Sequence, residues 1–137
     1  MSFDVKSIIL SGTKLKLKYK NPYYGISFPF RPLSDYEISL ITTEAMEIVS
    51  KKINIPAEKI REAIKTQKGD AQSVSFLSRY FLELKVLTIY YAMKDFCPPD
   101  FSPEDVRKMR GLNEFYEEIM KYSDMKLEEL KKFFRDK

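Results

Sequence analysis

The longest run of mostly hydrophobic positions in this chain lies between residues 71 and 96, AQSVSFLSRYFLELKVLTIYYAMKDF. The run contains neither glycine nor proline, is too long for an ordinary strand and ends at a Cys-Pro-Pro sequence, so it predicts a helix. Hydrophobic residues recur at helical spacing and wrap most of the way round this helix, which indicates burial by other elements. Four charged residues interrupt the run and argue against a membrane span: Arg79, Glu83, Lys85 and Lys94. We therefore predict a central buried helix.

Near the N-terminus the pattern changes to strict alternation. Residues 14–20, KLKLKYK, place leucine and tyrosine on one face and lysine on the other, as in a strand with one buried side. Residues 21–25, NPYYG, have the chemistry of a turn, and residues 26–30, ISFPF, alternate again. Pro29 has no backbone N–H to donate, which puts the second strand at an edge. The pattern predicts a β-hairpin whose hydrophobic face lies on the helices.

Helical periodicity returns after the hairpin. Ser34 and Glu37 have the spacing of a capping box and begin a helix that runs to about residue 50. Further helices are expected over residues 57–65, from Ser102-Pro103 onward, over 112–122 and over 126–135. The predicted fold is α+β. It has an N-terminal two-stranded β-hairpin (residues 1–33) and a predominantly α-helical body (34–137) of five to six helices around the central helix (71–96).

Composition indicates one soluble globular domain. The chain has 137 residues, of which 44% are hydrophobic and 32% are charged. The start, MSFDVKSIIL, lacks the basic segment and long hydrophobic stretch of a signal peptide. The single cysteine excludes an internal disulfide, so we expect a cytoplasmic protein. The excess of lysine over glutamine is typical of a thermophile, although an AT-rich genome gives a similar lysine content.

The positive charge is concentrated in the hairpin segment. Residues 1–33 carry six basic residues and one acidic residue, a net +5, whereas the other 104 residues carry a net −1. Four lysines share the exposed face of the first strand: Lys14, Lys16, Lys18 and Lys20. Such a face attracts anions, including nucleic acid, and nearby tyrosines can stack on bases. The alternative is that lysines protect an exposed sheet edge from aggregation.

No catalytic, cofactor-binding or metal-binding residue is predicted. The chain has no histidine, which removes the commonest general base and metal ligand. Cys97 has no evident activating base beside it and is interpreted as a small apolar residue at a helix end. The four glycines are scattered and form no phosphate-binding loop. We therefore expect a protein that is not an enzyme and needs no cofactor, while a pair of close carboxylates would reopen the enzyme alternative.

Hydrophobic residues near the C-terminus suggest a surface for partners. The helix expected over residues 126–135 carries four of them on one side: Leu127, Leu130, Phe133 and Phe134. A terminal helix frays unless it docks, so these side chains require burial against the chain itself or against a client protein.

Several segments together resemble the tail assembly chaperones of phages. Residues 30–37, FRPLSDYE, are similar to the strand-to-helix junction R-P-L-T/S-x-x-E of that family. Residues 85–99 resemble the family's hydrophobic helix with its aromatic-Pro-Asp ending, and a short S-P-E-D-V helix follows. Residues 117–123, EEIMKYS, match the pattern E-x-I-x-x-x-S. Family members often have glycine after this serine, where the present chain has Asp124.

The resemblance implies a binding protein of viral or proviral origin. Tail assembly chaperones keep the tape measure protein soluble and recruit tail tube subunits. For this chain we also expect self-association through the same surfaces. Applied to this chain, the resemblance implies no catalytic residue and a place in the host cytoplasm. A small basic nucleic-acid-binding protein that uses the lysine face of residues 14–20 is the alternative.

Overall fold

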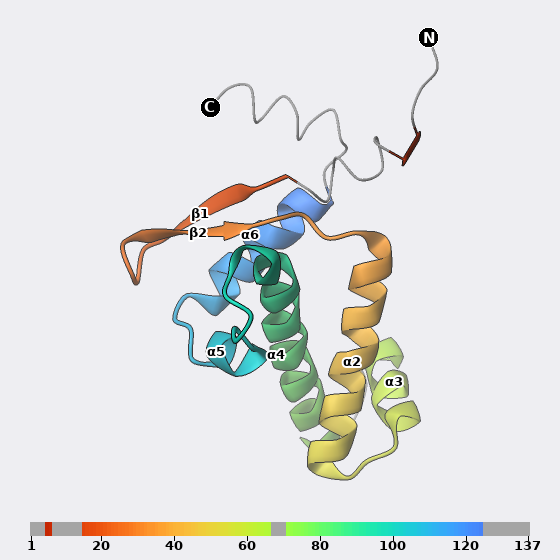
Figure 1. Cartoon of the computed structure of the whole chain (residues 1–137). Helices are drawn as coiled ribbons and strands as arrows, with labels where there is room; N and C mark the ends of the chain where they lie inside the picture. Colours follow the sequence, from red (N-terminus) through yellow and green to blue (C-terminus); the bar gives the residue numbers. More distant parts are fainter. Residues whose placement is uncertain (1–4, 7–14, 67–70, 125–137) are drawn as a thin grey trace. The chain divides into compact units, whose positions relative to one another are not determined.

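The computed structural model describes residues 5–6, 15–66 and 71–124 (Figure 1). In this part of the chain, strands β1 (Leu17–Asn21) and β2 (Ile26–Phe30) precede five α-helices. The helices are α2 (Asp35–Ile53), α3 (Ala57–Thr66), α4 (Ala71–Met93), α5 (Pro103–Arg107) and α6 (Leu112–Ser123), and the 3-10 turn η1 (Lys94–Phe96) follows α4. The predicted α+β class, a hairpin followed by helices, is confirmed. The helix expected over residues 126–135 lies outside the described residues.

Internal contacts group the chain into two compact units. The first, called the hairpin unit, comprises residues 1–34 and 89–137, and the second, called the helical unit, comprises residues 35–88. Helix α4 contributes its residues up to Thr88 to the helical unit and its last turn to the hairpin unit. The single domain predicted from chain length stays a prediction.

In the hairpin unit, β1 and β2 pair in antiparallel register and pack on α6 (Figure 1). Phe115 of α6 is fully buried at the centre of this contact. Its ring stacks on Tyr19 at a centroid distance of 4.9 Å and meets the edge of Phe30 at 5.6 Å. Rings of this size dominate the burial energy of a small core, so the α6 face and the hairpin stabilise each other.

Burial along the hairpin decreases toward its turn. Leu17 and Phe30 face each other across the strands, and both are buried. Tyr19 and Phe28 form the next pair on this face and are half-buried, and Ile26 is 59% exposed. The predicted buried face is therefore confirmed at the open end and wrong at Ile26. β1 begins at Leu17, so Leu15 and Lys16 precede the strand that was predicted to include them.

The helical unit contains α2, α3 and the first part of α4. Three residues of α2 spaced four apart are buried, Ile41, Ala45 and Val49, as the helical pattern predicts. Helix α2 ends where Asn54 takes a left-handed conformation with φ 53°, and the Ile55 N–H donates to the Ser50 carbonyl at 3.1 Å. This arrangement satisfies a carbonyl at the helix end and sets the break before α3.

Helix α4 is less evenly buried than its hydrophobic composition predicts. Its last described turns are buried almost all round, including Val86, Leu87 and Ile89. Earlier in the helix, however, Phe81 is 42% and Leu82 is 55% exposed. The predicted burial of nearly the whole surface of the helix is therefore wrong for the turn that contains Phe81 and Leu82. Among the described residues, no helix is long and hydrophobic enough to cross a membrane.

Candidate partner-binding surfaces

Arg31 ties the strand-to-helix junction to the end of α4. The Arg31 backbone N–H donates to the Ala92 carbonyl at 3.0 Å, where the helix leaves carbonyls without partners inside it. The Arg31 guanidinium is buried and forms an ion pair with Asp95 of η1, with Nε and Oδ2 2.7 Å apart. Arg31 also donates to the Pro32 carbonyl, so the buried charge is held by several acceptors.

The other end of the same junction is tied to α6. The Leu33 backbone N–H donates to the Ser123 hydroxyl at 2.9 Å, and that hydroxyl donates to the Ile119 carbonyl at 2.8 Å. Leu33 and Ile119 are both buried. Segments around residues 31–33, 95 and 119–123, which are far apart in the sequence, therefore meet in the hairpin unit.

The hairpin turn is fastened to the start of α6. Asn21, expected in an ordinary turn, is fully buried, and its Nδ2 donates to the Arg110 carbonyl at 3.0 Å. The Arg110 backbone N–H donates to the Tyr24 hydroxyl at 2.8 Å. The Arg110 guanidinium lies 5.1 Å from the centre of the Tyr23 ring. These contacts engage Tyr23 and Tyr24, two of the three tyrosines that could stack on bases, although each stays more than 40% exposed. The third, Tyr19, stacks on Phe115.

Three of the four predicted lysines form one exposed face of the hairpin. Lys16, Lys18 and Lys20 are exposed, and Lys14 lies outside the described residues. In the strand pairing, Lys18 lies opposite Pro29 and Lys20 opposite Ser27, so neither faces a carboxylate across the strands. The Lys16 ammonium lies 5.4 Å from the centre of the Phe96 ring. The face is therefore cationic and open to an anionic partner.

Neither a cluster of metal ligands nor an activated cysteine is found among the described residues. No group of three or more Cys, Asp or Glu side chains there could hold a metal ion. Cys97 is half-buried, and this burial raises the pKa of its thiol. A raised pKa lowers the fraction of reactive thiolate at neutral pH. The four hydrophobic residues predicted to bind a client, Leu127, Leu130, Phe133 and Phe134, lie outside the described residues.

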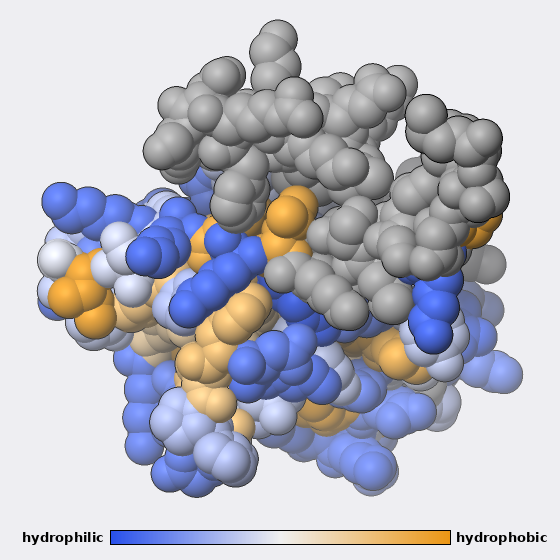
Figure 2. Space-filling view, turned by 45° about the horizontal axis from the view of Figure 1, so that its top comes forward, coloured by the Kyte–Doolittle hydropathy of each residue, from blue (hydrophilic) through white to orange (hydrophobic). Residues whose placement is uncertain are grey.

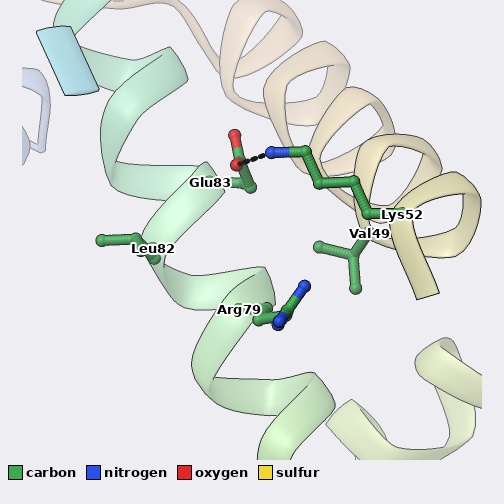
Figure 3. A pocket seen from close by; sticks show the side chains of 5 residues that line it. All are labelled: Val49, Lys52, Arg79, Leu82 and Glu83. Carbon is green, nitrogen blue, oxygen red and sulfur yellow. Dashed lines mark hydrogen bonds and ion pairs between the residues drawn. The ribbon is translucent and has the colours of Figure 1, made fainter.

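A groove in the helical unit lies between α2 and α4 (Figure 3). It has a volume of about 280 Å³ and is lined by Val49, Lys52, Arg79, Leu82 and Glu83. Figure 3 shows Lys52 and Glu83 pointing toward each other across the groove, with Arg79 and Val49 directed into the same space and Leu82 directed away from it. The groove thus combines an apolar wall, two cations and one carboxylate.

Glu83 is the unusual residue of this groove. It is one of the charged residues that interrupt the hydrophobic run, and yet its side chain is only 8% exposed. Its Oε1 lies 3.1 Å from the Lys52 ammonium, whose side chain is 51% exposed. A buried carboxylate needs such a partner, because an isolated charge pays a large desolvation cost. Sequence reasoning missed the groove; the available signal was an acid inside a long hydrophobic run.

Figure 2 shows hydrophilic residues over most of the described part of one face, with hydrophobic residues in small separate groups between them. In comparisons with known proteins, no protein family, curated protein or solved structure matches the chain.

Proposed function

We propose that this protein is a non-enzymatic tail assembly chaperone of a virus or provirus. In this role it binds a long helical client of the tape measure type and tail tube subunits in the host cytoplasm. The observation that supports the proposal best is the meeting of three sequence segments that resemble that family. Arg31 contacts Asp95, and Leu33 contacts Ser123, within one unit.

Segments around residues 31–33, 85–99 and 117–123 are separated in the sequence. A backbone N–H, a buried guanidinium and a serine hydroxyl join them through hydrogen bonds. The residues that carry the resemblance thus form one connected structural set, and the proposal rests on this set.

The surface of the helical unit is also suited to a helical client. Leu82 of α4 is exposed beside the charged groove. An amphipathic client helix lays its apolar side chains on such a surface and sets its register through charges. The hydrophobic residues of 126–135 that the sequence predicts to bind the client lie outside the described residues.

The test combines gene context with protein capture. We expect the DNA downstream to encode a very long, helix-rich protein, and we expect that protein to remain soluble only when it is co-expressed with this chain. A stable complex purified through a tag on this chain is the supporting result. Unrelated downstream genes, together with no capture of the neighbouring product, would overturn the proposal.

Nucleic-acid binding is a second candidate, favoured by the exposed face of Lys16, Lys18 and Lys20. If these three lysines neutralise three phosphates, a plot of log affinity against log salt has a slope of about −3. We expect the double variant Lys16→Glu, Lys18→Glu to abolish binding in a fluorescence assay with duplex DNA, and Lys51→Glu on α2 serves as a matched control. No binding at low salt would remove this candidate.

A further inference from the structure

We propose that the groove between α2 and α4 binds an acidic side chain of a partner helix, with an adjacent apolar residue of that helix on Leu82. This inference rests on the proposed function, because it names the site and the kind of client segment that the chaperone holds. The occupant is an amphipathic helix that carries glutamate or aspartate next to its hydrophobic stripe.

The charges of the groove favour an incoming carboxylate. Lys52 is engaged by Glu83, with Nζ and Oε1 3.1 Å apart. Arg79 is exposed, points into the same space in Figure 3 and has no ion-pair partner among the described residues. Two cations therefore face one carboxylate, and the excess charge is a guanidinium, which pairs with carboxylates in a planar, two-bonded geometry.

The apolar wall of the groove suits the stem of an acidic side chain. This groove measures about 280 Å³ and is walled on one side by Val49, which is 1% exposed. A single acidic side chain on its short apolar stem fits such a space, because the stem lies on the apolar wall while the carboxylate reaches Arg79.

The exposure of Leu82 indicates that the contact extends beyond the groove. Arg79 and Leu82 are three residues apart and so are neighbours on the helix surface. Leu82 is 55% exposed at the edge of the groove, and Figure 3 shows its side chain directed away from the hollow. A partner helix that inserts an acid at one position can cover Leu82 with a hydrophobic residue three or four positions away.

The experiment uses two synthetic helical peptides of about 21 residues, three heptads long, with leucine at the core positions. One peptide carries glutamate and the other carries lysine beside the leucine stripe, and each has a fluorescent label. Binding to the full chain is measured by fluorescence anisotropy. We expect the glutamate peptide to bind at least about tenfold more tightly than the lysine peptide, a difference of about 1.4 kcal/mol.

Two variants locate the effect. Arg79→Glu should weaken binding of the glutamate peptide at least about tenfold, because attraction becomes repulsion, and should strengthen binding of the lysine peptide. Arg61→Glu changes an exposed arginine of α3 that does not line the groove, so it should leave both affinities within about twofold. Circular dichroism of each variant shows whether the fold is retained.

The outcomes separate this inference from the proposed function. Equal binding of both peptides, or an Arg79→Glu effect no larger than that of Arg61→Glu, overturns the groove assignment. Competition by free glutamate at millimolar concentration instead of by the peptide also overturns it, since the occupant would then be a small molecule. If the downstream gene product co-purifies equally with wild type and Arg79→Glu, the chaperone function stands and this site is wrong.

Discussion

Gly111 provides the sharpest test of how the hairpin turn is fastened to α6. This residue has a φ of 74°, in the left-handed region that side chains with a Cβ disfavour. A Cβ there would lie 2.7 Å from Tyr23 Cδ2 and 3.2 Å from Asn21 Oδ1. Gly25 at the hairpin turn has a similar φ of 70°, but nothing lies within 4 Å of the position of its Cβ. An alanine at either position therefore pays the same backbone cost, but only at position 111 does its Cβ collide with neighbouring side chains.

The magnitudes follow from this comparison. The left-handed conformation costs an alanine about 1–2 kcal/mol, so Gly25→Ala should lower the free energy of unfolding by about that amount. Gly111→Ala pays the same cost and must also displace the Tyr23 ring from the Arg110 guanidinium, a contact worth about 0.5–1 kcal/mol. Strain on the buried Asn21 hydrogen bonds adds about 1 kcal/mol. We therefore expect a total loss of about 2.5–4 kcal/mol for Gly111→Ala.

Urea unfolding followed by circular dichroism measures both variants. The slope of free energy against urea should be unchanged, so that the shift in midpoint reports stability alone. The double variant Gly111→Ala, Tyr23→Ala should lose the contact part of the cost and keep the backbone part. Equal destabilisation by Gly25→Ala and Gly111→Ala would refute the reasoning, because it would show that the turn does not press on residue 111.

Four further predictions concern the core, the tyrosines, the cysteine and the C-terminus. Phe115→Ala should cost about 3–5 kcal/mol in urea unfolding, whereas Phe81→Ala, at an exposed position, should cost less than 1.5 kcal/mol, and similar costs would contradict the assigned core. Burial and the nearby acids of α6 raise the pKa of Tyr19. Because the unfolded tyrosine loses its proton near pH 10 while the folded one retains it, the free energy of unfolding should fall as the pH rises above about 10. Tyr19→Phe should make this fall shallower, and an unchanged pH profile would count against the shift. Burial also raises the pKa of Cys97, so iodoacetamide at pH 8 should modify it more slowly in the native protein than in urea, as mass spectrometry can follow. Phe134→Asp should weaken capture of the helical client without changing the unfolding curve, and retained capture would exclude this residue from the site.

Much of the secondary structure follows from local pattern. The hydrophobic run after residue 70, the break at Pro56 and the Ser102-Pro103 start each predict a helix boundary that the structure has to within a few residues. In α5, for example, the Asp105 carboxylate accepts from the Ser102 backbone N–H at 2.9 Å, as the spacing of a cap and an acid predicts. The hairpin follows from alternation for the same reason, since the period of hydrophobic residues is a property of neighbouring positions.

The burial of polar residues was decided only by tertiary structure. Asn21 reads as an ordinary turn residue, but it is fully buried because the carbonyl of Arg110, 89 positions away, accepts its hydrogen bond. Glu83 reads as part of a wet edge, but it is buried because Lys52, 31 positions away, supplies the opposite charge.

The two candidate surfaces also differ in whether the sequence alone reveals them. The lysine face of the hairpin is visible in the sequence, since alternation alone puts its members on one side of a strand. The groove beside Arg79 requires two helices to meet, and its signal in the sequence is a single acid in a hydrophobic run. Periodicity thus determined which segments fold into helices and strands, because backbone geometry is local. Contacts between distant segments decided which charges are buried and which stay open to a partner, because a buried polar group requires a partner that its sequence neighbours do not supply.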